Sequence, residues 1–542
     1  MAKKSPKFIF VVGGVLSGVG KGVTTASLGA IFKAKGLSVT ALKADPYINV
    51  DAGTMNPIEH GEVFVTDDRD ETDQDMGNYE RFLDVNLSSN DYMTTGRVYQ
   101  TVIDNERAMK YKGRCVQVVP HIPEEIIRRI KTASIAHKAD ITIIEVGGTV
   151  GEYENILFLE AARMMKLETP TDVAFVLVSY LPTPSHLGEM KTKPTQHAAR
   201  ALNSTGINAD VIIARGQHEL DQPRLEKLAV FCGVKPEHCI SAPDVASIYQ
   251  IPKVLENQQL GNKLLKILGA KPRVTNLKPW NDFVNKIEHS KKEVKVAVVG
   301  KYFATGDFTL ADSYHSVIEA IKHAAWFHNH KPVLTWIDSE DFERDPKSVK
   351  KLSEYDGLIV PGGFGTRGIE GIITAIKYAR ESKLPYLGIC YGMQLATIEF
   401  ARNVLGKKQA HTVEVNPKTP DPIIHINPTQ AKNVSANRYG GTMRLGAYDA
   451  KLKKGSKIRA AYGQDIVSER HRHRYEFNNE YREMIDKAGL EIVGINPETD
   501  LVEMIELKNH PYFVGTQAHP EFKSRPMRPH PLFREFIKAA IK

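Results

Sequence analysis

Short hydrophobic runs bounded by glycine turns recur along the first half of the chain. Runs that are rich in β-branched residues read as buried strands, and helical patterns lie between them. These runs cover residues 8–12, 37–42, 141–146, 173–179 and 210–214. Strands that alternate with helices over roughly 260 residues predict a parallel sheet with helices on both faces. In such a sheet, ligands bind at the carboxyl ends of the strands.

A second set of strands begins after a stretch in which this pattern loosens. That stretch, residues 268–292, holds a short segment over 280–287 and otherwise reads as a linker. A strand over 294–299 then opens the second domain. A chain of 542 residues is too long for one hydrophobic core. We therefore predict an α/β protein with two doubly wound domains, residues 1–267 and residues 293–542.

Composition narrows the class of protein. Hydrophobic residues make up 42% of the chain and charged residues 25%, which is ordinary for a globular protein. A net charge of +8 suits anionic ligands such as nucleotides, and no basic–aromatic repeat points to nucleic acid. The N-terminus lacks the apolar core of a signal peptide, and no apolar run is long enough for a membrane span. We expect a cytoplasmic protein with no nucleic-acid or membrane partner.

The four cysteines contain no CxxC pair, which argues against a zinc site or a disulfide framework. Cys232 and Cys239 flank His238, and we expect them to pack in a core rather than to bind metal. A reducing compartment would leave a reactive thiol free.

The first strand opens into a glycine loop that predicts a phosphate site. Residues 13–22 read Gly-Gly-Val-Leu-Ser-Gly-Val-Gly-Lys-Gly, and a helix follows to about Lys35. Backbone N–H groups, a helix N-terminus and a lysine converge on anionic oxygens in such a cradle. The match to the standard P-loop is incomplete, because Val15 replaces a glycine and Gly22 replaces a serine or threonine. A tight strand–helix turn without a ligand is the alternative.

Carboxylates near this loop predict a metal site. The stretch over residues 61–77 is rich in Asp and Glu, including Asp75. The strand over 141–146 carries Glu145 toward a glycine turn, much as a Walker B strand delivers an acid to a metal. Such oxygen ligands suit Mg²⁺. A solvated acidic surface and a helix cap are the alternative interpretations.

A basic loop lies between two later strands. Residues 191–196 read Lys-Thr-Lys-Pro-Thr-Gln, and two lysines with two threonines suit a polyphosphate. An exposed basic loop without a ligand is the alternative.

A cysteine in the second domain has the setting of a nucleophile. An apolar strand runs into Gly-Ile-Cys-Tyr-Gly and then into a helix, which places Cys390 on a sharp turn where the helix dipole favours the thiolate. The glycine turn at 361–365 can offer N–H groups to an oxyanion. His519 and Glu521 follow as base and orienting carboxylate, and the three residues predict a nucleophilic triad. A buried core cysteine is the alternative for Gly-x-Cys-x-Gly alone.

These motifs resemble known families. The triad with its glycine turn resembles a class I glutamine amidotransferase domain. In the first half, GGVLSGVGKG, LKADPYINVDAGTMNPIEHGEVFV, ETDQDMGNYERF, EVGGTVGE and KTKPTQH follow one another as in CTP synthases. The resemblance to CTP synthases covers nearly all of the chain.

The resemblance implies an ATP- and glutamine-dependent ligase that converts UTP to CTP. ATP would phosphorylate the uracil O4, and ammonia would then displace the phosphate at C4. Residues 1–267 would be a P-loop-like synthase domain, and residues 293–542 a triad glutaminase domain. Ammonia would pass between them through an internal tunnel, whose mouth is matched by His60 and Val63.

The resemblance also implies site residues. ATP would contact Gly18, Val19, Gly20, Lys21, Gly22, Val23, Asp75, Pro243, Asp244 and Val245. UTP and CTP would share Ser17, Lys191, Thr192, Lys193, Pro194, Thr195, Gln196 and Lys227. CTP as inhibitor would also contact Glu152, Tyr153 and Glu154, a stretch that differs from some relatives. Glutamine would be held by Gly363, Tyr391, Gly392, Met393, Gln394, Glu414 and Arg474.

Catalysis in the glutaminase domain would then rest on Cys390, His519 and Glu521, with an oxyanion hole formed by the N–H groups of Gly363 and Tyr391. Mg²⁺, bound with ATP, would be held by Asp75 and Glu145. The resemblance further implies GTP as activator of glutamine hydrolysis, CTP as feedback inhibitor and a homotetramer.

Two other classes of protein remain as alternatives. One is an amidotransferase with another acceptor, such as a cobyrinate amide-forming enzyme, which the domain order and the Lys-Thr-Lys-Pro-Thr-Gln loop disfavour. The other is a nucleotide-dependent switch or filament protein with a vestigial triad. A steady-state assay with UTP, ATP and glutamine separates all three.

Overall fold

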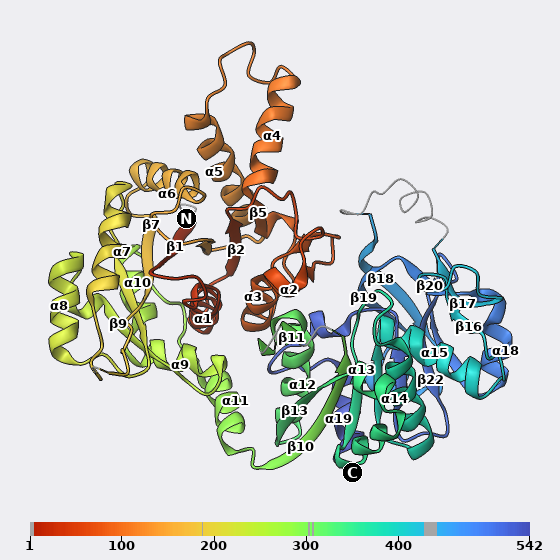
Figure 1. The fold of residues 1–542 in the computed structure, drawn as a ribbon. Coiled ribbons are helices and arrows are strands. Elements are labelled where there is room, and N and C mark those ends of the chain that lie inside the picture. Colours follow the sequence, from red (N-terminus) through yellow and green to blue (C-terminus); the bar gives the residue numbers. More distant parts are fainter. Residues whose placement is uncertain (1–4, 187, 302–303, 306–307, 310, 428–441) are drawn as a thin grey trace. The chain divides into compact units, whose positions relative to one another are not determined.

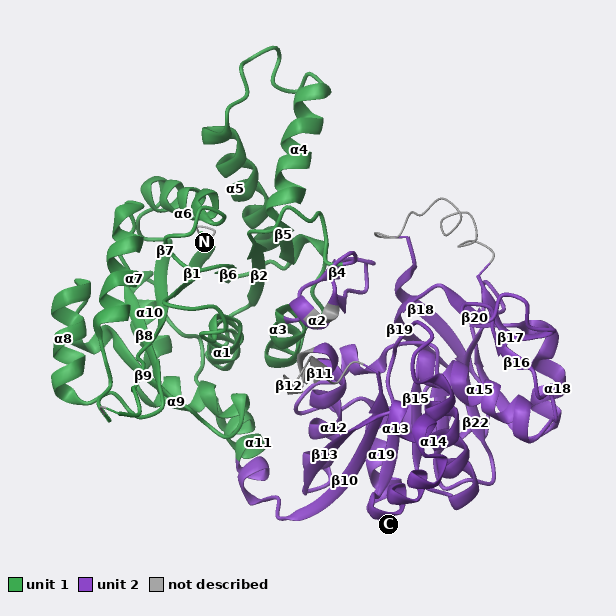
Figure 2. Cartoon of the chain, viewed as in Figure 1, with its two compact units in different colours: residues 1–52, 75–284 green, residues 53–74, 285–542 purple. Residues whose placement is uncertain are grey.

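The structure is a computed structural model that describes residues 5–186, 188–301, 304–305, 308–309, 311–427 and 442–542. The chain folds into two compact units (Figure 2). The first comprises residues 1–52 and 75–284, and the second comprises residues 53–74 and 285–542. The second unit thus includes a short segment from far upstream in the sequence. Among the described residues, no helix has both the length and the apolar character that a membrane crossing requires.

The first unit is built on a seven-stranded parallel sheet with the order β5-β2-β6-β1-β7-β8-β9 (Figure 1). Its strands are β1 Lys7–Gly14, β2 Val39–Asp45, β5 Tyr92–Thr94, β6 Ile141–Val146, β7 Val173–Tyr180, β8 Val211–Gly216 and β9 Cys239–Pro243. The central strand β1 is buried on both faces. Phe8, Phe10 and Val12 face one hydrophobic cluster, while Ile9 and Val11 are buried on the other face. The predicted parallel sheet is confirmed.

Helices cover this sheet and connect its strands. They are α1 Lys21–Ala34, α3 Asp75–Leu83, α4 Thr95–Arg107, α5 Val118–Ala136, α6 Ile156–Glu168, α7 Lys193–Ser204, α8 Gln222–Cys232, α9 Ile251–Asn257 and α10 Leu260–Ile267. Helix α11 Lys278–His289 follows them and continues past residue 284, where the first unit ends. Local signals set their ends: Asp221 accepts from the Arg224 N–H to cap α8, and Gly233 ends α8 in a left-handed conformation. Helix α11 lies in the stretch that reads as a linker, and the Trp280 indole N–H donates to the Tyr249 carbonyl at 2.8 Å.

Cys232 and Cys239 both lie in the core of the first unit. Burial raises the pKa of Cys232 to about 11 and that of Cys239 to about 12. Both thiols are therefore protonated and pack as small apolar side chains.

The second unit is built on a nine-stranded mixed sheet with the order β13-β10-β14-β15-β23-β22-β21-β18-β19. Its strands are β10 Lys292–Gly300, β13 His330–Asp338, β14 Gly357–Val360, β15 Tyr386–Ile389, β18 Arg444–Leu452, β19 Ile466–His473, β21 Leu490–Ile495, β22 Val502–Leu507 and β23 Phe513–Thr516. Strands β13 to β23 in this order run parallel, and β23 to β19 pair antiparallel. The antiparallel half extends the predicted doubly wound sheet.

The helices of the second unit are α2 Pro57–His60, α12 His315–Phe327, α13 Glu340–Arg344, α14 Ile369–Ser382, α15 Tyr391–Asn403, α17 Lys457–Tyr462, α18 Arg482–Lys487 and α19 Pro531–Ala540. Small sheets pair β3 Phe64–Val65 with β4 Glu71–Thr72, β11 Ala304–Thr305 with β12 Phe308–Thr309, and β16 Ala410–Thr412 with β17 Asp421–Ile426 and β20 Tyr475–Phe477.

The segment of residues 53–74 is held in the second unit by ion pairs to strand β19. Arg470 is fully buried, and its Nε donates to Asp67 Oδ1 at 2.7 Å. Two residues further, Arg472 Nε donates to Glu71 Oε1 at 2.8 Å. The Phe64 ring packs edge-on against Phe522 at a centroid distance of 5.0 Å. These contacts join the β3–β4 hairpin to β19.

We predict that Asp67→Ala loosens this hairpin. The change leaves the buried Arg470 guanidinium without this carboxylate, and losing a hydrogen bond to a charged group costs about 1.5–3 kcal/mol. Hydrogen exchange of peptides covering residues 64–72 should become at least about tenfold faster. Glu59→Ala, at an exposed position of the same segment, is the control and should leave exchange unchanged. Equal exchange in Asp67→Ala and wild type would contradict the role of this ion pair.

Candidate active sites

The glycine loop of the first unit has the backbone of a phosphate cradle. Strand β1 ends at Gly14 and α1 begins at Lys21. Between them, Val15, Gly18 and Gly20 have φ values of 81°, 72° and 94°, in the left-handed region. Left-handed residues in a loop that leads to a helix N-terminus turn successive N–H groups toward one point. The loop therefore can bind an anion at the start of α1.

Lys21 is buried beside this loop. Its Nζ donates to the Gly148 carbonyl at 2.8 Å, which brings the turn after β6 next to the loop. Burial lowers the pKa of Lys21, and the charge of Glu145 opposes that shift. The Lys21 ammonium thus lies at the carboxyl ends of the central strands.

The structure explains why a glycine, Gly22, follows Lys21. A Cβ placed on Gly22 would lie 2.1 Å from Asp75 Oδ1, so a serine or threonine cannot occupy this position without displacing that carboxylate. In the standard P-loop, the hydroxyl at this place holds Mg²⁺. Here the Asp75 carboxylate occupies the same neighbourhood, which explains the incomplete match in the sequence.

Asp75 and Glu145, the two predicted metal ligands, meet at the ammonium group of Lys43. Lys43 Nζ lies 2.5 Å from Asp75 Oδ2 and 3.0 Å from Glu145 Oε1, and the Tyr79 hydroxyl donates to Glu145 Oε2. Burial raises the pKa of Glu145. Burial also opposes ionisation of Asp75, but the Lys43 charge outweighs it and lowers the pKa of Asp75. Only the place of Lys43 near the end of β2 could have indicated this role from the sequence.

These carboxylates fit Mg²⁺ by their chemistry and number. Among the residues that the structure describes, no group of three or more His, Cys, Asp or Glu side chains could hold a metal ion. Mg²⁺ is usually held by one or two carboxylates, with substrate phosphates and water completing the shell. Asp75 and Glu145, beside a phosphate loop, meet that requirement.

Arg215, at the end of β8, connects the glycine loop to the predicted adenine side. Its Nη2 lies 3.2 Å from Asp244 Oδ1, and its Nε lies 3.6 Å from the position of a Cβ built on Gly20. Pro243 ends β9 directly before Asp244 and Val245. Sequence reasoning missed Arg215, because only its position at a strand end could have signalled it.

The basic loop forms the start of helix α7. Thr192 is the N-cap residue, and Gln196 Nε2 donates to Thr192 Oγ1 at 3.1 Å. Lys191 pairs with Glu189 at 2.7 Å, and Lys193 Nζ lies 5.9 Å from the centre of the Phe231 ring. The remaining predicted nucleotide contacts differ in exposure. Thr195 is buried and Pro194 is half-buried, whereas Ser17 on the glycine loop and Lys227 on α8 are exposed.

The predicted inhibitor stretch lies on the turn after β6. Glu152, Tyr153 and Glu154 are all exposed, Tyr153 to 93%. Glu152 Oε2 accepts from the Thr149 N–H at 2.8 Å, whereas Tyr153 projects into solvent.

In the second unit, Cys390 sits on the predicted strand-to-helix turn. It lies between β15 and α15 with φ 50° and ψ −98°, a conformation that is strained for a residue with a Cβ. A Cβ on Gly392 would lie 2.2 Å from the Val360 carbonyl, so the close approach of α15 to β14 requires glycine there. The Cys390 side chain is buried at the N-terminus of α15.

His519 and Glu521 form a buried pair beside this turn. His519 Nδ1 and Glu521 Oε1 are 2.8 Å apart. Burial lowers the pKa of His519, but the charges of Glu521 and Cys390 outweigh it and raise the pKa to about 10. Within the described part of the chain, His519 Nε2 has no hydrogen-bond partner. A Cβ on Gly362 would lie 2.8 Å from His519 Cε1, so the imidazole lies against the glycine turn after β14.

A cavity of about 750 Å³ in the second unit brings these residues together. Of the predicted catalytic and glutamine-binding residues, it is lined by Cys390, His519, Glu521, Gly363, Tyr391, Gln394, Glu414 and Arg474. Val63, one of the two residues that match the tunnel mouth, also lines it, whereas His60 is exposed outside the lining. Met393 and Gly392 are buried in α15 and do not reach the lining.

Glu414 and Arg474 give this cavity charged groups of both signs. Glu414 Oε1 accepts from the Gly365 N–H at 3.0 Å, and burial raises the pKa of Glu414. Arg474 Nη1 donates to Thr442 Oγ1 at 3.0 Å. An ammonium and a carboxylate, such as those of an amino acid, would each find an opposite charge here.

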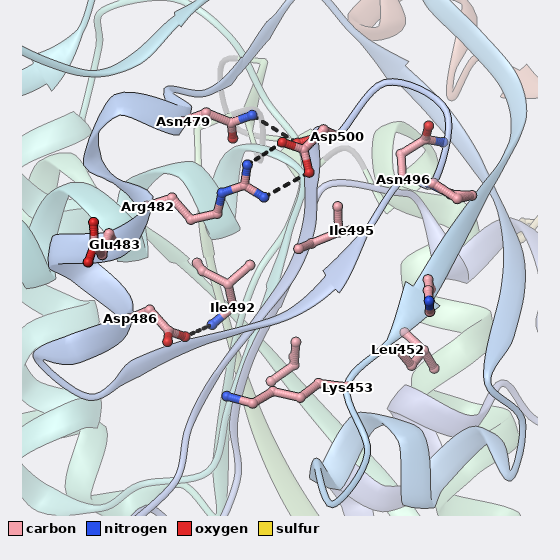
Figure 3. Close-up of a pocket in the computed structure, with 13 residues that line it drawn as sticks. Leu452, Lys453, Asn479, Arg482, Glu483, Asp486, Ile492, Ile495, Asn496 and Asp500 are labelled. Carbon is pink, nitrogen blue, oxygen red and sulfur yellow. Dashed lines mark hydrogen bonds and ion pairs between the residues drawn. The ribbon is translucent and has the colours of Figure 1, made fainter.

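A second hollow, of about 640 Å³, lies between β18, α18 and β21 (Figure 3). Arg482 Nη1 lies 2.9 Å from Asp500 Oδ1, Asn479 donates to the Asp500 carbonyl, and Asp486 accepts from the Ile492 N–H (Figure 3). Its charged side chains thus hold the surrounding loops, and it contains none of the predicted site residues.

Two protein families match separate parts of the chain. Residues 7–270 match the family "CTP synthase N-terminus", and residues 309–539 match "Glutamine amidotransferase class-I". A CTP synthase of Carboxydothermus hydrogenoformans is 51% identical over 537 residues, covering 99% of both chains. A CTP synthase of Thermococcus gammatolerans is 50% identical over 536 residues, covering 98% of both. The solved glutaminase domain of Trypanosoma brucei CTPS with bound acivicin is 37% identical, with a TM-score of 0.42, over 46% of this chain and 94% of that one.

The α/β fold and the two family matches define the class of protein as a glutamine amidotransferase, with the amidotransferase part in the second unit. The chain belongs to the CTP synthase family. Members of this family are glutamine-dependent ligases that make CTP from UTP with ATP.

Proposed function

We propose that the chain catalyses the ATP-dependent amination of UTP to CTP, with ammonia released from glutamine. The observation that carries the proposal is the cavity that joins Cys390 and His519 with Glu414 and Arg474. We assign residues 1–267 to the synthase domain, residues 268–292 to a linker and residues 293–542 to the glutaminase domain. We also propose a cytoplasmic location.

In the glutaminase reaction, the Cys390 thiolate attacks the amide carbon of glutamine. Glu414 holds the amino group and Arg474 the carboxylate of the substrate. N–H groups of Gly363 and Tyr391 stabilise the oxyanion. The pKa of about 10 keeps His519 protonated, so it can give a proton to the leaving ammonia. Glu521 holds the imidazole by its Nδ1.

In the synthase reaction, the first unit transfers a phosphoryl group before the amination. The uracil O4 is a poor leaving group, so phosphorylation by ATP precedes its displacement by ammonia at C4. Lys21 and the glycine loop position the ATP phosphates, while Lys191 and its neighbours in α7 hold the UTP triphosphate. Mg²⁺ held by Asp75 and Glu145 would offset the charge in the transfer.

Ammonia must reach the second reaction without protonation in bulk water, so we propose an internal tunnel. Val63 in the wall of the cavity that holds Cys390 supports a route that starts there. By membership of the family, we also propose a homotetramer, activation of glutamine hydrolysis by GTP, and feedback inhibition by CTP.

Cys390→Ala should abolish glutamine-dependent CTP formation and leave ammonia-dependent formation intact. The variant removes the nucleophile but no group of the first unit. Both rates are measured in one steady-state assay with UTP and ATP, using glutamine or an ammonium salt. Loss of both rates in a folded variant would overturn the model of separate sites.

Lys21→Ala and Asp75→Ala should each lower the rate of CTP formation at least about a hundredfold, with either ammonia or glutamine as the nitrogen source. Both variants remove charge from the phosphoryl-transfer site, where electrostatic groups carry most of the catalysis. Basal glutamine hydrolysis should persist. Lys33→Ala, at an exposed position of the same helix α1, serves as the control and should keep both activities. Wild-type synthesis in Lys21→Ala or Asp75→Ala would refute the assigned roles.

Glu154→Ala should weaken CTP inhibition at least several-fold and leave the UTP KM within about twofold. A carboxylate can accept from the cytosine 4-amino group, which UTP lacks, and such a match discriminates by roughly 1–3 kcal/mol. Lys191→Ala should instead weaken UTP and CTP together, because it acts on the shared triphosphate. If Glu154→Ala raised both constants in parallel, the turn after β6 would not be specific for CTP.

A further inference from the structure

The sulfur of Cys390 faces a hydrogen-bond donor that the triad does not include. Gln517 Nε2 lies 3.5 Å from Cys390 Sγ. Gln517 is fully buried on the segment between β23 and His519, and its backbone N–H donates to the Glu503 carbonyl at 2.8 Å. The donor is therefore held by the same strand end that presents His519.

The orientation of the Gln517 amide follows from its neighbours. Gln394 Nε2 lies 2.9 Å from the Tyr475 carbonyl oxygen and 3.2 Å from Gln517 Oε1. A backbone carbonyl only accepts, so the end of Gln394 that faces it must be the NH₂ group. That NH₂ group then requires an acceptor, so Gln517 turns its oxygen to Gln394. The other end of Gln517, which faces the sulfur, must be the donor.

The Tyr475 carbonyl, which sets the orientation of both amides, is itself held by two buried histidines. His473 Nδ1 lies 3.1 Å from the Tyr475 oxygen, and His473 Nε2 lies 2.9 Å from His471 Nδ1. Burial lowers the pKa of both histidines well below the usual range, so each ring carries one N–H. His473 gives its N–H to the carbonyl, and His471 gives its own to His473. All donors in this chain therefore have defined directions.

We propose that Gln517 is a catalytic residue of the glutaminase reaction, whose amide N–H stabilises the Cys390 thiolate and aims it at the amide carbon of glutamine. The inference rests on the proposed role of Cys390 as nucleophile. A hydrogen bond to an ionised acceptor is roughly twice as strong as one between neutral groups, so this donor favours the thiolate over the thiol.

The same bond acts twice in the reaction. In the first step the C–S bond forms, the C–N bond breaks, and His519 supplies the proton that leaves with ammonia. In the second step water attacks the thioester and gives a proton to His519, which the first step left neutral. Glutamate is released, and the electron pair of the C–S bond returns to sulfur. Gln517 stabilises the thiolate before the first step and as the leaving group of the second.

The test is the pH profile of alkylation at Cys390 in the full-length chain, measured with iodoacetamide and resolved by mass spectrometry. Gln517→Met removes the donor at similar length, and Gln517→Glu replaces the NH₂ group by an acceptor. We expect the midpoint for alkylation of Cys390 to rise by roughly one pH unit in Gln517→Met and by more in Gln517→Glu. Exposed Cys115 is the internal reference and should react equally in all variants.

Other titratable groups line the same cavity, and the Gln517 variants leave them in place. They are Glu62, Tyr314, Tyr391, Glu414, Arg472, His473, Arg474, Tyr475, His519 and Glu521. Wild-type midpoints in both Gln517 variants would overturn the proposal. The variants should also lower kcat for glutamine hydrolysis about tenfold or more with little change in KM, whereas a purely structural role would move the two together or not at all.

A third variant tests the proposal if the Gln517 variants do not fold. Gln394→Met leaves Gln517 in place but removes the donor that fixes its orientation, so we expect a smaller rise of the same midpoint, and no rise would count against the proposal. Ammonia-dependent CTP formation reports folding throughout. If Cys390→Ala kept glutamine-dependent synthesis, the nucleophile itself would be wrongly assigned. If Cys390→Ala lost glutamine-dependent synthesis but the Gln517 variants were alkylated as wild type, the role of Gln517 would be wrong and that of Cys390 would stand.

Discussion

The glutaminase site depends on one strained residue, Cys390, held in a left-handed conformation between strand β15 and helix α15. Such a backbone costs about 1–3 kcal/mol and persists only where its surroundings hold it. Here the Cys390 N–H donates to the Thr516 carbonyl at 2.6 Å, which ties the turn to the end of β23. Because β14, β15 and β23 are neighbours in the sheet, the glycine turn, the thiol and His519 meet at one edge.

Buried charge imposes a comparable constraint on the first unit. Lys21 and Lys43 lie among Asp75 and Glu145, and each cation compensates carboxylates that burial would otherwise neutralise. Removing one member would leave another charge uncompensated in a buried place. If a metal ion and phosphates bound here, the metal ion would compensate the carboxylates and the lysines would compensate the phosphates. The net charge of the filled site would then stay close to that of the empty one.

Local patterns in the sequence were sufficient to predict much of the two sites. The glycine loop, Cys390 and the His519–Glu521 pair each lie within one strand–turn–helix or one turn, where spacing alone decides which residues meet. The sheet order could not be read in this way, nor could contacts between distant residues. Lys43 meets Glu145 across 102 positions, and Gln517 meets Cys390 across 127 positions. No periodicity links such pairs.

The acidic stretch over residues 61–77 shows the same limit. Its sequence suggests either a solvated surface or metal ligands, and only Asp75 lies in the cluster with Glu145. Asp67 and Glu71 instead pair with Arg470 and Arg472 of β19, which are separated from them by 403 and 401 positions. A carboxylate has the same appearance in the sequence whether its partner is a metal, a lysine or an arginine, so composition alone cannot distinguish these roles.

The choice of an amide beside the thiolate is consistent with the demands of the reaction. A second cation close to the sulfur would hold the thiolate more firmly, but a sulfur that is held too firmly is a weaker nucleophile. His519, charged by its contact with Glu521, already supplies one cation at this site. A neutral donor such as Gln517 adds direction and modest stabilisation without a further charge. The Tyr475 carbonyl, which can only accept, sets the orientation of the Gln517 amide through Gln394. Because an amide is neutral and always carries its N–H groups, this donor does not depend on a protonation step.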